Sequence, residues 1–302
     1  MMIACVDAGQ TKTTLCLLNE NAEVLCKKED SPIIHPAKAG GLNSFREITL
    51  SLCDMLKDVN KDHELSICFS LSGYHGENDV VPNLIKQTIR EKGIFTNSLH
   101  IVPDYIGNWF AATRGKPGII IICGGGTVVY GKNSDGASYR FGGWGHLLGD
   151  EGSGYWIGIE AIKAALKGSA RVTRKKTSLE VQLKNFLNYN DEWDLISSIY
   201  SGEISDKKIA HIVPIVETLA KKDDPICLEI LNQAIDHLVN DCLVVMHKIG
   251  EHPLYLSGGL FNSKWITENL KRRFLQKNFK QLVQSITIDP ITGAYYIAKN
   301  GL

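Results

Sequence analysis

Asp104 is the residue whose type and position most directly suggest chemistry, because it follows a short apolar run at 99–103. A carboxylate at the carboxyl end of a strand in an α/β protein points toward the crevice where ligands bind. From there it could accept a proton from a hydroxyl group that attacks a phosphate. An N-cap for a helix over 105–113 is an equally good reading of the same residue, and the sequence leaves both open.

A turn at residues 7–13 joins the first two predicted strands and contains Gly9, Thr11 and Lys12. Backbone N–H groups in such a turn can cradle phosphate oxygens, and glycine allows close approach. Asp7 could hold Mg²⁺ through water, since Mg²⁺ sheds its waters reluctantly. The segment is neither a Walker A loop nor a dinucleotide fingerprint. Taken alone, it is better explained as an ordinary hairpin turn.

Two further glycine turns follow predicted strands. The first is a run of three glycines before a threonine, with the residues Gly124, Gly125, Gly126 and Thr127. Successive glycines are costly in conformational entropy, so we expect something to approach this backbone closely, and a phosphate chain fits. The second comprises Ser257, Gly258 and Gly259. It could lie against a flat ring such as adenine, or it could be a plain strand-to-helix turn.

The densest glycine segment spans residues 142–156 and contains Gly143 and Trp144. The apolar face of an indole can stack on a sugar ring while polar neighbours bind the hydroxyls. Asp150 and Glu151 stand where a helix is predicted to begin, a place that favours acidic residues through the helix dipole. Helix capping is therefore the simpler reading for these two carboxylates.

The elements that position these residues come in two similar series. The first series has strands at 2–6, 13–19 and 23–29, a helix at 43–59, a strand at 65–71, a helix at 79–91, a strand at 99–103 and a helix to about 113. The second has strands at 119–123, 127–132 and 137–141, a helical region at 153–249, a strand at 254–257, a helix at 263–276, a strand at 284–288 and a helix at 290–299.

A strand, a glycine turn and a second strand therefore occur twice. This duplication predicts two related α/β domains that face each other across a cleft, where small ligands usually bind. We place the domains at 1–114 and 115–302, and we expect the last helix, about 290–300, to pack back on the N-terminal domain.

Composition excludes several classes of function. The 302 residues are 44% hydrophobic and 22% charged with a net charge of zero, so no broad basic surface for nucleic acid or anionic membrane is expected. The eight cysteines include no C-x-x-C pair, which favours buried free thiols in a reducing cytosol. No apolar segment is long enough to span a bilayer. We therefore predict a cytoplasmic protein.

Taken together, these segments resemble the BadF/BadG/BcrA/BcrD-type ATPase family and, within it, the N-acetylglucosamine kinases. The run from Gly142 to Trp156 is the most specific match, and the glycine turns match its phosphate and adenosine motifs. The family belongs to the actin, Hsp70 and sugar kinase superfamily. The resemblance therefore implies a duplicated ribonuclease H-like, actin-like ATPase fold and direct transfer of the γ-phosphate of ATP to a sugar hydroxyl.

The same resemblance implies roles for individual residues. Asp104 would be the general base, and Asp7 would organise Mg²⁺ through water. The ATP contacts would be Gly9, Thr11, Lys12, Gly124, Gly125, Gly126, Ser257, Gly258 and Gly259. The sugar contacts would be Asn43, Asp104, Thr127, Gly143, Trp144 and Asp150. Ala8 and Gln10 stand where the family usually has glycine. Many related kinases are homodimers, although no interface stripe is readable here.

Three functions stay open within this resemblance. The first is a kinase for N-acetylglucosamine or a related hexose or amino sugar, and 2-keto-3-deoxygluconate is an alternative acceptor. The second is an ATP-hydrolysing activator of a 2-hydroxyacyl-CoA dehydratase, which would need cysteines near the cleft for an iron–sulfur cluster. The third is a non-catalytic sugar-binding regulator, and Asp104 counts against it because a regulator would be expected to lose the base.

Overall fold

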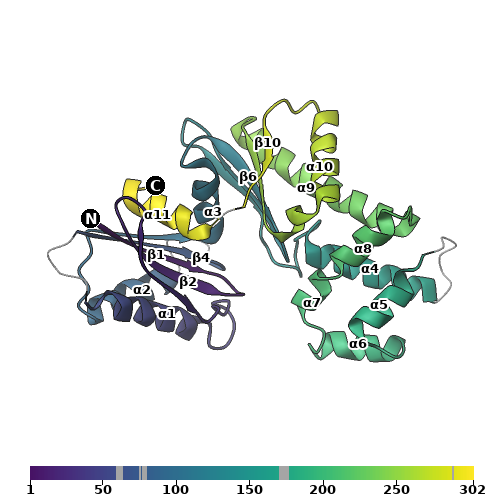
Figure 1. Cartoon of the computed structure of the whole chain (residues 1–302), viewed down its shortest axis with the longest axis horizontal. Coiled ribbons are helices and arrows are strands. Elements are labelled where there is room, and N and C mark those ends of the chain that lie inside the picture. Colours follow the sequence, from purple (N-terminus) through teal and green to yellow (C-terminus); the bar gives the residue numbers. More distant parts are fainter. Residues whose placement is uncertain (59–63, 75, 77–79, 170–176, 288) are drawn as a thin grey trace. The chain divides into compact units, whose positions relative to one another are not determined.

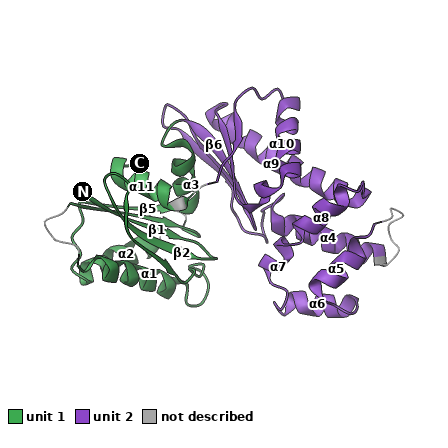
Figure 2. Ribbon diagram, in the orientation of Figure 1, with its two compact units in different colours: residues 1–116, 288–302 green, residues 117–287 purple. Residues whose placement is uncertain are grey.

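The computed structural model describes residues 1–58, 64–74, 76, 80–169, 177–287 and 289–302. The chain divides into two compact units (Figure 2). Unit 1 contains Met1–Lys116 and Ile288–Leu302, and unit 2 contains Pro117–Thr287. The C-terminal segment therefore returns to the unit that the N-terminus begins.

Unit 1 is built on a five-stranded sheet in the order β3-β2-β1-β4-β5. β1 pairs antiparallel with β2 and parallel with β4, β2 pairs antiparallel with β3, and β4 pairs parallel with β5. The strands are β1 (Met2–Ala8), β2 (Thr13–Asn19), β3 (Val24–Asp30), β4 (Leu65–Leu71) and β5 (Ser98–Pro103). The parallel pairs bring the carboxyl ends of β1, β4 and β5 to one edge of the sheet, which is where a site in an α/β fold is expected.

Helices cover both faces of this sheet (Figure 1). α1 (Gly41–Leu56) and α2 (Val80–Glu91) pack on one face, where alternate residues of the central strands form an apolar core. Phe45, Ile48 and Leu52 recur at helical spacing along α1 and are all buried, as their spacing predicts. α3 (Asp104–Thr113) and α11 (Pro290–Asn300) pack together on the sheet residues of β1, β4 and β5.

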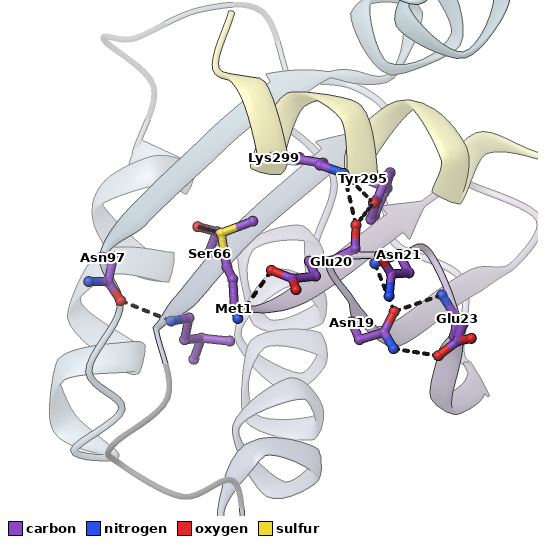
Figure 3. A network of polar contacts seen from close by, with 10 residues as sticks. Met1, Asn19, Glu20, Asn21, Glu23, Ser66, Asn97, Tyr295 and Lys299 are labelled. Atoms are coloured by element: carbon purple, nitrogen blue, oxygen red, sulfur yellow. Dashed lines mark hydrogen bonds and ion pairs between the residues drawn. The ribbon is translucent and has the colours of Figure 1, made fainter.

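The C-terminal helix is held to unit 1 along its length. Near its start, Gly293 lies so close to α3 that a Cβ atom there would stand 1.8 Å from the carbonyl oxygen of Gly107. Further along, the Tyr295 hydroxyl and the Lys299 ammonium both donate to the carbonyl oxygen of Glu20, at 2.7 and 2.8 Å (Figure 3). Helix α11 is therefore an integral part of this unit.

Unit 2 repeats the same sheet. Its order is β10-β9-β6-β7-β8, again with two antiparallel pairs on one side of the first strand and two parallel pairs on the other. The strands are β6 (Gly118–Cys123), β7 (Thr127–Lys132), β8 (Ser138–Gly142), β9 (Leu254–Ser257) and β10 (Val283–Ser285). The duplication predicted from the two glycine turns is therefore confirmed.

The helices of unit 2 lie between β8 and β9 or after β9, and they bury one large apolar core. They are α4 (Gly154–Ser169), α5 (Leu179–Leu187), α6 (Glu192–Tyr200), α7 (Asp206–Ala210), α8 (Val213–Ala220), α9 (Pro225–Ile249), the short 3₁₀ helix η1 (Gly259–Asn262) and α10 (Lys264–Gln276). None of the helices in the described part of the chain is long and apolar enough to cross a membrane.

The structure refines two predicted segments. The helical region predicted at 153–249 is divided, within its described residues, into six helices, because Asn188 ends α5 in a left-handed conformation and Ser205 and Asp224 begin new helices as N-caps. The strand predicted at 284–288 is only Val283–Ser285, and residue 288 lies outside the described residues, as do residues 59 and 79 of the predicted helices.

All eight cysteines lie in the described part of the chain and are free, and Cys26 on edge strand β3 is the exposed one. Burial raises the pKa of the Cys68 thiol far above its usual range and that of Cys123 to about 12, so these thiols stay protonated and inert. We expect a thiol reagent to modify one cysteine in the native protein and eight after unfolding. Cys26→Ser should abolish the native reaction, whereas rapid modification of several native thiols would contradict this assignment.

Candidate functional site

The carboxyl edge of the unit 1 sheet gathers three carboxylates. Asp7 stands one residue before the end of β1, opposite Ser70 of β4. Asp104 is the first residue of α3, directly after β5, and Asp289 caps α11 by accepting from the Ile291 N–H at 3.1 Å. Burial raises the pKa of Asp7 to about 7, repulsion from Asp104 and Asp289 adds to the rise, and Ser70 and Lys12 partly offset it.

Asp104 does not serve as the helix N-cap that the sequence left open. The N-cap position of α3 is held by Pro103, and Asp104 lies inside the first turn, where its carbonyl oxygen accepts from the Asn108 amide at 2.9 Å. An acidic residue in the first turn is still favoured by the helix dipole. The side chain is therefore placed at the sheet edge beside Asp7 by the short connection from β5.

The first glycine turn is a tight hairpin with an exposed tip. The Gly9 N–H donates to the Lys12 carbonyl at 3.0 Å, and the Gly9 carbonyl accepts from the Ile33 N–H at 3.1 Å. Gln10, Thr11 and Lys12 are exposed. Lys12 lies 3.7 Å from Glu29, but both side chains are largely in solvent, so this ion pair contributes little. The hairpin leaves the tip accessible to a ligand.

Asn43, the other predicted sugar contact of unit 1, lies on α1. It is the third residue of this helix, it is exposed, and its amide donates to Glu47 of the same helix at 2.8 Å. Unit 1 therefore brings Asp7 and Asp104 together, and Asn43 is bonded within its own helix.

The second glycine turn, at the end of β6, is tied to the start of α4. The Gly124 N–H donates to the Gly126 carbonyl at 2.9 Å, and the Gly124 carbonyl accepts from the Gly154 N–H at 2.8 Å. A Cβ on Gly126 would lie 2.6 Å from Oδ2 of Asp150. This close approach explains why the third position of the turn is glycine.

Asp150, Thr127 and Gly143 lie together in unit 2. The Thr127 N–H donates to Oδ1 of Asp150 at 3.2 Å, and the Gly143 N–H donates to the Thr127 carbonyl at 2.9 Å. Asp150 has a left-handed backbone, with φ of 63°, and is buried. Burial raises the pKa of its carboxyl group. The capping interpretation of Asp150 is wrong, because the Ser153 hydroxyl accepts from the Trp156 N–H at the start of α4.

Trp144 offers an open aromatic surface beside this group. Its side chain is 50% exposed, its edge packs on Phe141 with ring centroids 5.2 Å apart, and Gly149 lies against the ring. Leu147 and Leu148 in the same loop are also exposed. A half-covered indole next to a buried carboxylate is the arrangement expected of a site that stacks on a sugar ring and binds its hydroxyls.

The third glycine turn lies directly beside the second. Ser257 ends β9 opposite Ile122 of β6, and the ideal Cβ position of Gly124 is 3.9 Å from the Gly259 nitrogen. Gly258 has φ of 106°, and a Cβ there would stand 2.2 Å from the Cys123 carbonyl oxygen. The two turns predicted to bind phosphate and adenosine are thus neighbours at one edge of the unit 2 sheet.

Gly258→Ala is expected to destabilise the protein by about 3 kcal/mol or more, because the new methyl group meets backbone and the φ angle disfavours any L-residue. Gly259→Ala is the matched control, since a Cβ at Gly259 meets nothing within 4 Å and should cost less than about 1 kcal/mol. Urea unfolding of the two variants measures the difference. Equal midpoints would contradict the close packing at Gly258.

Two acidic residues were missed by the sequence analysis. Asp289 reaches the Asp7 region only through the return of α11, although an Asp-Pro pair before a helical segment is a readable N-cap signal. Asp241 lies on α9, where burial and the neighbouring Glu151 raise its pKa to about 7. No sequence signal distinguishes Asp241 from other polar residues of a long helix.

Two sheets of identical topology, each with a glycine turn after its first strand, give the duplicated α/β, actin-like fold that the sequence predicts. The chain belongs to the BadF/BadG/BcrA/BcrD ATPase family, whose model matches residues 5–298. It is similar to the N-acetylmuramic acid/N-acetylglucosamine kinase of Clostridium acetobutylicum, with 33% identity over 98% of this chain and 97% of the relative. It is 32% identical to the N-acetyl-D-glucosamine kinase of Dictyostelium discoideum, with the same coverage.

A solved structure supports the fold. The crystal structure of a candidate N-acetylglucosamine kinase from Chromobacterium violaceum superposes with a TM-score of 0.76 at 21% identity, covering 98% of both chains. At that identity the likeness concerns the fold alone.

Proposed function

We propose that this chain is an ATP-dependent sugar kinase whose acceptor is N-acetylglucosamine or a closely related amino sugar. The observation that carries the proposal is the full-length similarity to two relatives named as kinases of such sugars, on a chain that keeps Asp104 at the carboxyl edge of the unit 1 sheet. N-Acetylmuramic acid, which one relative is named for, belongs among the acceptors to be tested.

ATP binding is assigned to the glycine turns. The neighbouring turns Gly124–Gly126 and Ser257–Gly259 present backbone at one sheet edge, which suits phosphates and a flat base. The exposed hairpin tip with Gly9, Thr11 and Lys12 supplies further phosphate donors. Gln10 shares this exposed tip, so its side chain has room to turn away from a bound phosphate.

Sugar binding is assigned to Trp144, Asp150, Thr127 and Gly143, which the structure groups in unit 2, and to Asn43 and Asp104 in unit 1. Asp150 and Trp144 provide a buried acceptor and a stacking face. Asp104 accepts the proton of the attacking hydroxyl as that oxygen bonds to the γ-phosphorus and the bond from phosphorus to ADP breaks. Most of the rate enhancement then comes from holding the two substrates in line.

The residues present fit a magnesium ion near Asp7. A half-buried carboxylate whose pKa is raised first by burial and then by two like charges gains most from a divalent cation, which would restore its charged form. Mg²⁺ typically keeps several waters and binds one or two carboxylates plus substrate phosphates, so Asp7 would hold it through water. When bound, the ion would neutralise charge on the transferred phosphoryl group.

The alternative as a dehydratase activator finds no support in the thiols. Cys123, which precedes the second glycine turn, is buried, and burial raises its pKa to about 12. The free thiols also support a reducing compartment, and we propose the cytoplasm.

The test is a coupled ADP-release assay with Mg-ATP and a panel of acceptors. The panel contains N-acetylglucosamine, N-acetylmuramic acid, glucosamine, glucose, N-acetylmannosamine and 2-keto-3-deoxygluconate. Sugar-dependent turnover that is greatest with an N-acetylated amino sugar is expected. Turnover only with the keto acid would change the acceptor, and turnover with none of them would refute the kinase assignment.

A further inference from the structure

His146 lies between Trp144 and Asp150 in the sugar-binding loop, defined here as residues 143–150, and the proposed function gives it no task. Its ring packs on the ring of Tyr155 with centroids 4.6 Å apart and planes at 47°. Its Nδ1 atom lies 3.9 Å from Oδ2 of Asp206. The side chain is 35% exposed, so it is partly enclosed by these partners.

Both partners of His146 stand on backbone that is fixed elsewhere. The Tyr155 N–H donates to the Gly125 carbonyl at 3.3 Å, so the stacking partner is tied to the nucleotide-binding turn, residues 124–126. Asp206 begins α7, and this helix packs so tightly on α4 that a Cβ on Gly158 would stand 2.2 Å from the Ile209 carbonyl oxygen. The ring of His146 therefore rests on a rigid surface made by α4 and α7.

The loop that carries His146 closes a backbone turn, in which the Leu148 and Gly149 N–H groups donate to the Gly145 carbonyl at 3.1 and 2.9 Å. Gly143 and Gly145 have φ angles of 70° and 81°, and Asp150 has a left-handed backbone. Glycines give a chain conformational freedom that must be removed by contacts from outside. Trp144 packs its edge on Phe141 but is half exposed, so the partly enclosed ring of His146 gives this end of the loop a second anchor.

We propose that His146 is a positioning residue that holds the sugar-binding loop against the nucleotide-binding turn through Tyr155 and Asp206. In this arrangement Trp144 and Asp150 meet the sugar in a single geometry beside the bound phosphates. The inference rests on the proposed function for the assignment of the sugar site. That His146 holds the loop 143–150 in place concerns unit 2 alone and does not depend on that assignment.

The kinetic test compares three variants with the wild type. His146→Ala should raise the KM for the sugar about tenfold while kcat and the KM for ATP stay within about threefold, because the loop is loosened and the phosphate turn is not. Asp206→Asn should raise the sugar KM about threefold, since it removes one exposed partner. His237→Phe is the matched control. His237 lies on α9 and its ring packs on Trp156 of α4, the helix that also carries Tyr155, so the change should alter neither KM.

Amide hydrogen exchange tests the positioning without any turnover. Peptides that cover residues 143–150 should exchange faster in His146→Ala than in the wild type or in His237→Phe, and those that cover 124–126 should change little. Unchanged exchange in the loop would overturn the proposal, as would sugar KM values within twofold of wild type in both the His146 and the Asp206 variants. A parallel rise in the KM for ATP would also overturn it.

The outcomes separate this inference from the proposed function. If the wild type shows no sugar-dependent turnover, the kinase assignment fails and the exchange data alone decide whether His146 holds the loop. If His146→Ala does not fold, the sugar KM of Asp206→Asn decides whether the proposal holds. The Asp206 side chain is 67% exposed, so this variant should fold.

Discussion

Asp104→Asn is expected to lower kcat by about a thousandfold while the protein folds and binds ATP normally. Asparagine keeps the size of the side chain and its preference for the start of a helix, but it cannot accept a proton. Pro103, not Asp104, holds the N-cap position of α3. If the Asp104 side chain only stabilised the start of this helix, asparagine would replace it and the variant would stay active. General-base catalysis typically contributes between about 10² and 10⁴ in rate, which sets the expected loss.

The measurement is sugar-dependent ADP release beside the affinity for ATP. The affinity for ATP should be unchanged in Asp104→Asn, because the carboxylate is assigned to the sugar hydroxyl and not to the nucleotide. Asp54→Asn, on the exposed face of α1, is the matched control and should keep full activity. A kcat within tenfold of wild type for Asp104→Asn would remove Asp104 from the reaction.

Local signals were sufficient for much of the fold. The strands at 13–19, 65–71, 127–132 and 254–257 have their predicted bounds, because β-branched and aliphatic runs are closed on both sides by turn residues. The region between α4 and α9 was not divided from the sequence. Its breaks at 188–191 and 201–205 are short, and they lie between segments that all have helical spacing of apolar residues. The apolar period alone does not show where one helix ends.

The candidate site divides in a similar way. The three glycine turns could be predicted because runs of glycine are a local signal with a physical cost. The bond from Thr127 to Asp150 could not, because it needs the left-handed backbone of Asp150 to direct the carboxylate back to the turn. The approach of Asp289 to Asp7 likewise depends on where α11 packs, and packing between distant segments leaves no local pattern.

Asp7→Asn is expected to abolish sugar phosphorylation and yet to stabilise the ligand-free protein above pH 7. The pKa of Asp7 rises from 3.8 to about 7, chiefly through burial and then through repulsion from Asp104 and Asp289. A carboxyl group whose pKa is raised by folding binds its proton more tightly in the native state. Its stabilising contribution is complete below pH 4 and is lost as the pH rises through 7. Asparagine is neutral at every pH and escapes this loss.

The free energy of unfolding should therefore be higher in Asp7→Asn by an amount that grows between pH 4 and pH 7 and reaches on the order of 4 kcal/mol at pH 8. Urea unfolding between pH 5 and pH 8.5 without nucleotide or magnesium measures the curve, and Asp54→Asn should run parallel to wild type. Activity should fall by at least about a hundredfold, since the carboxylate that would organise charge at the phosphates is gone. A variant that is both less stable at pH 8 and inactive would indicate a structural role for Asp7 instead. A variant that is more stable but inactive would show that the ionised carboxylate destabilises the native fold and is nevertheless needed for the reaction.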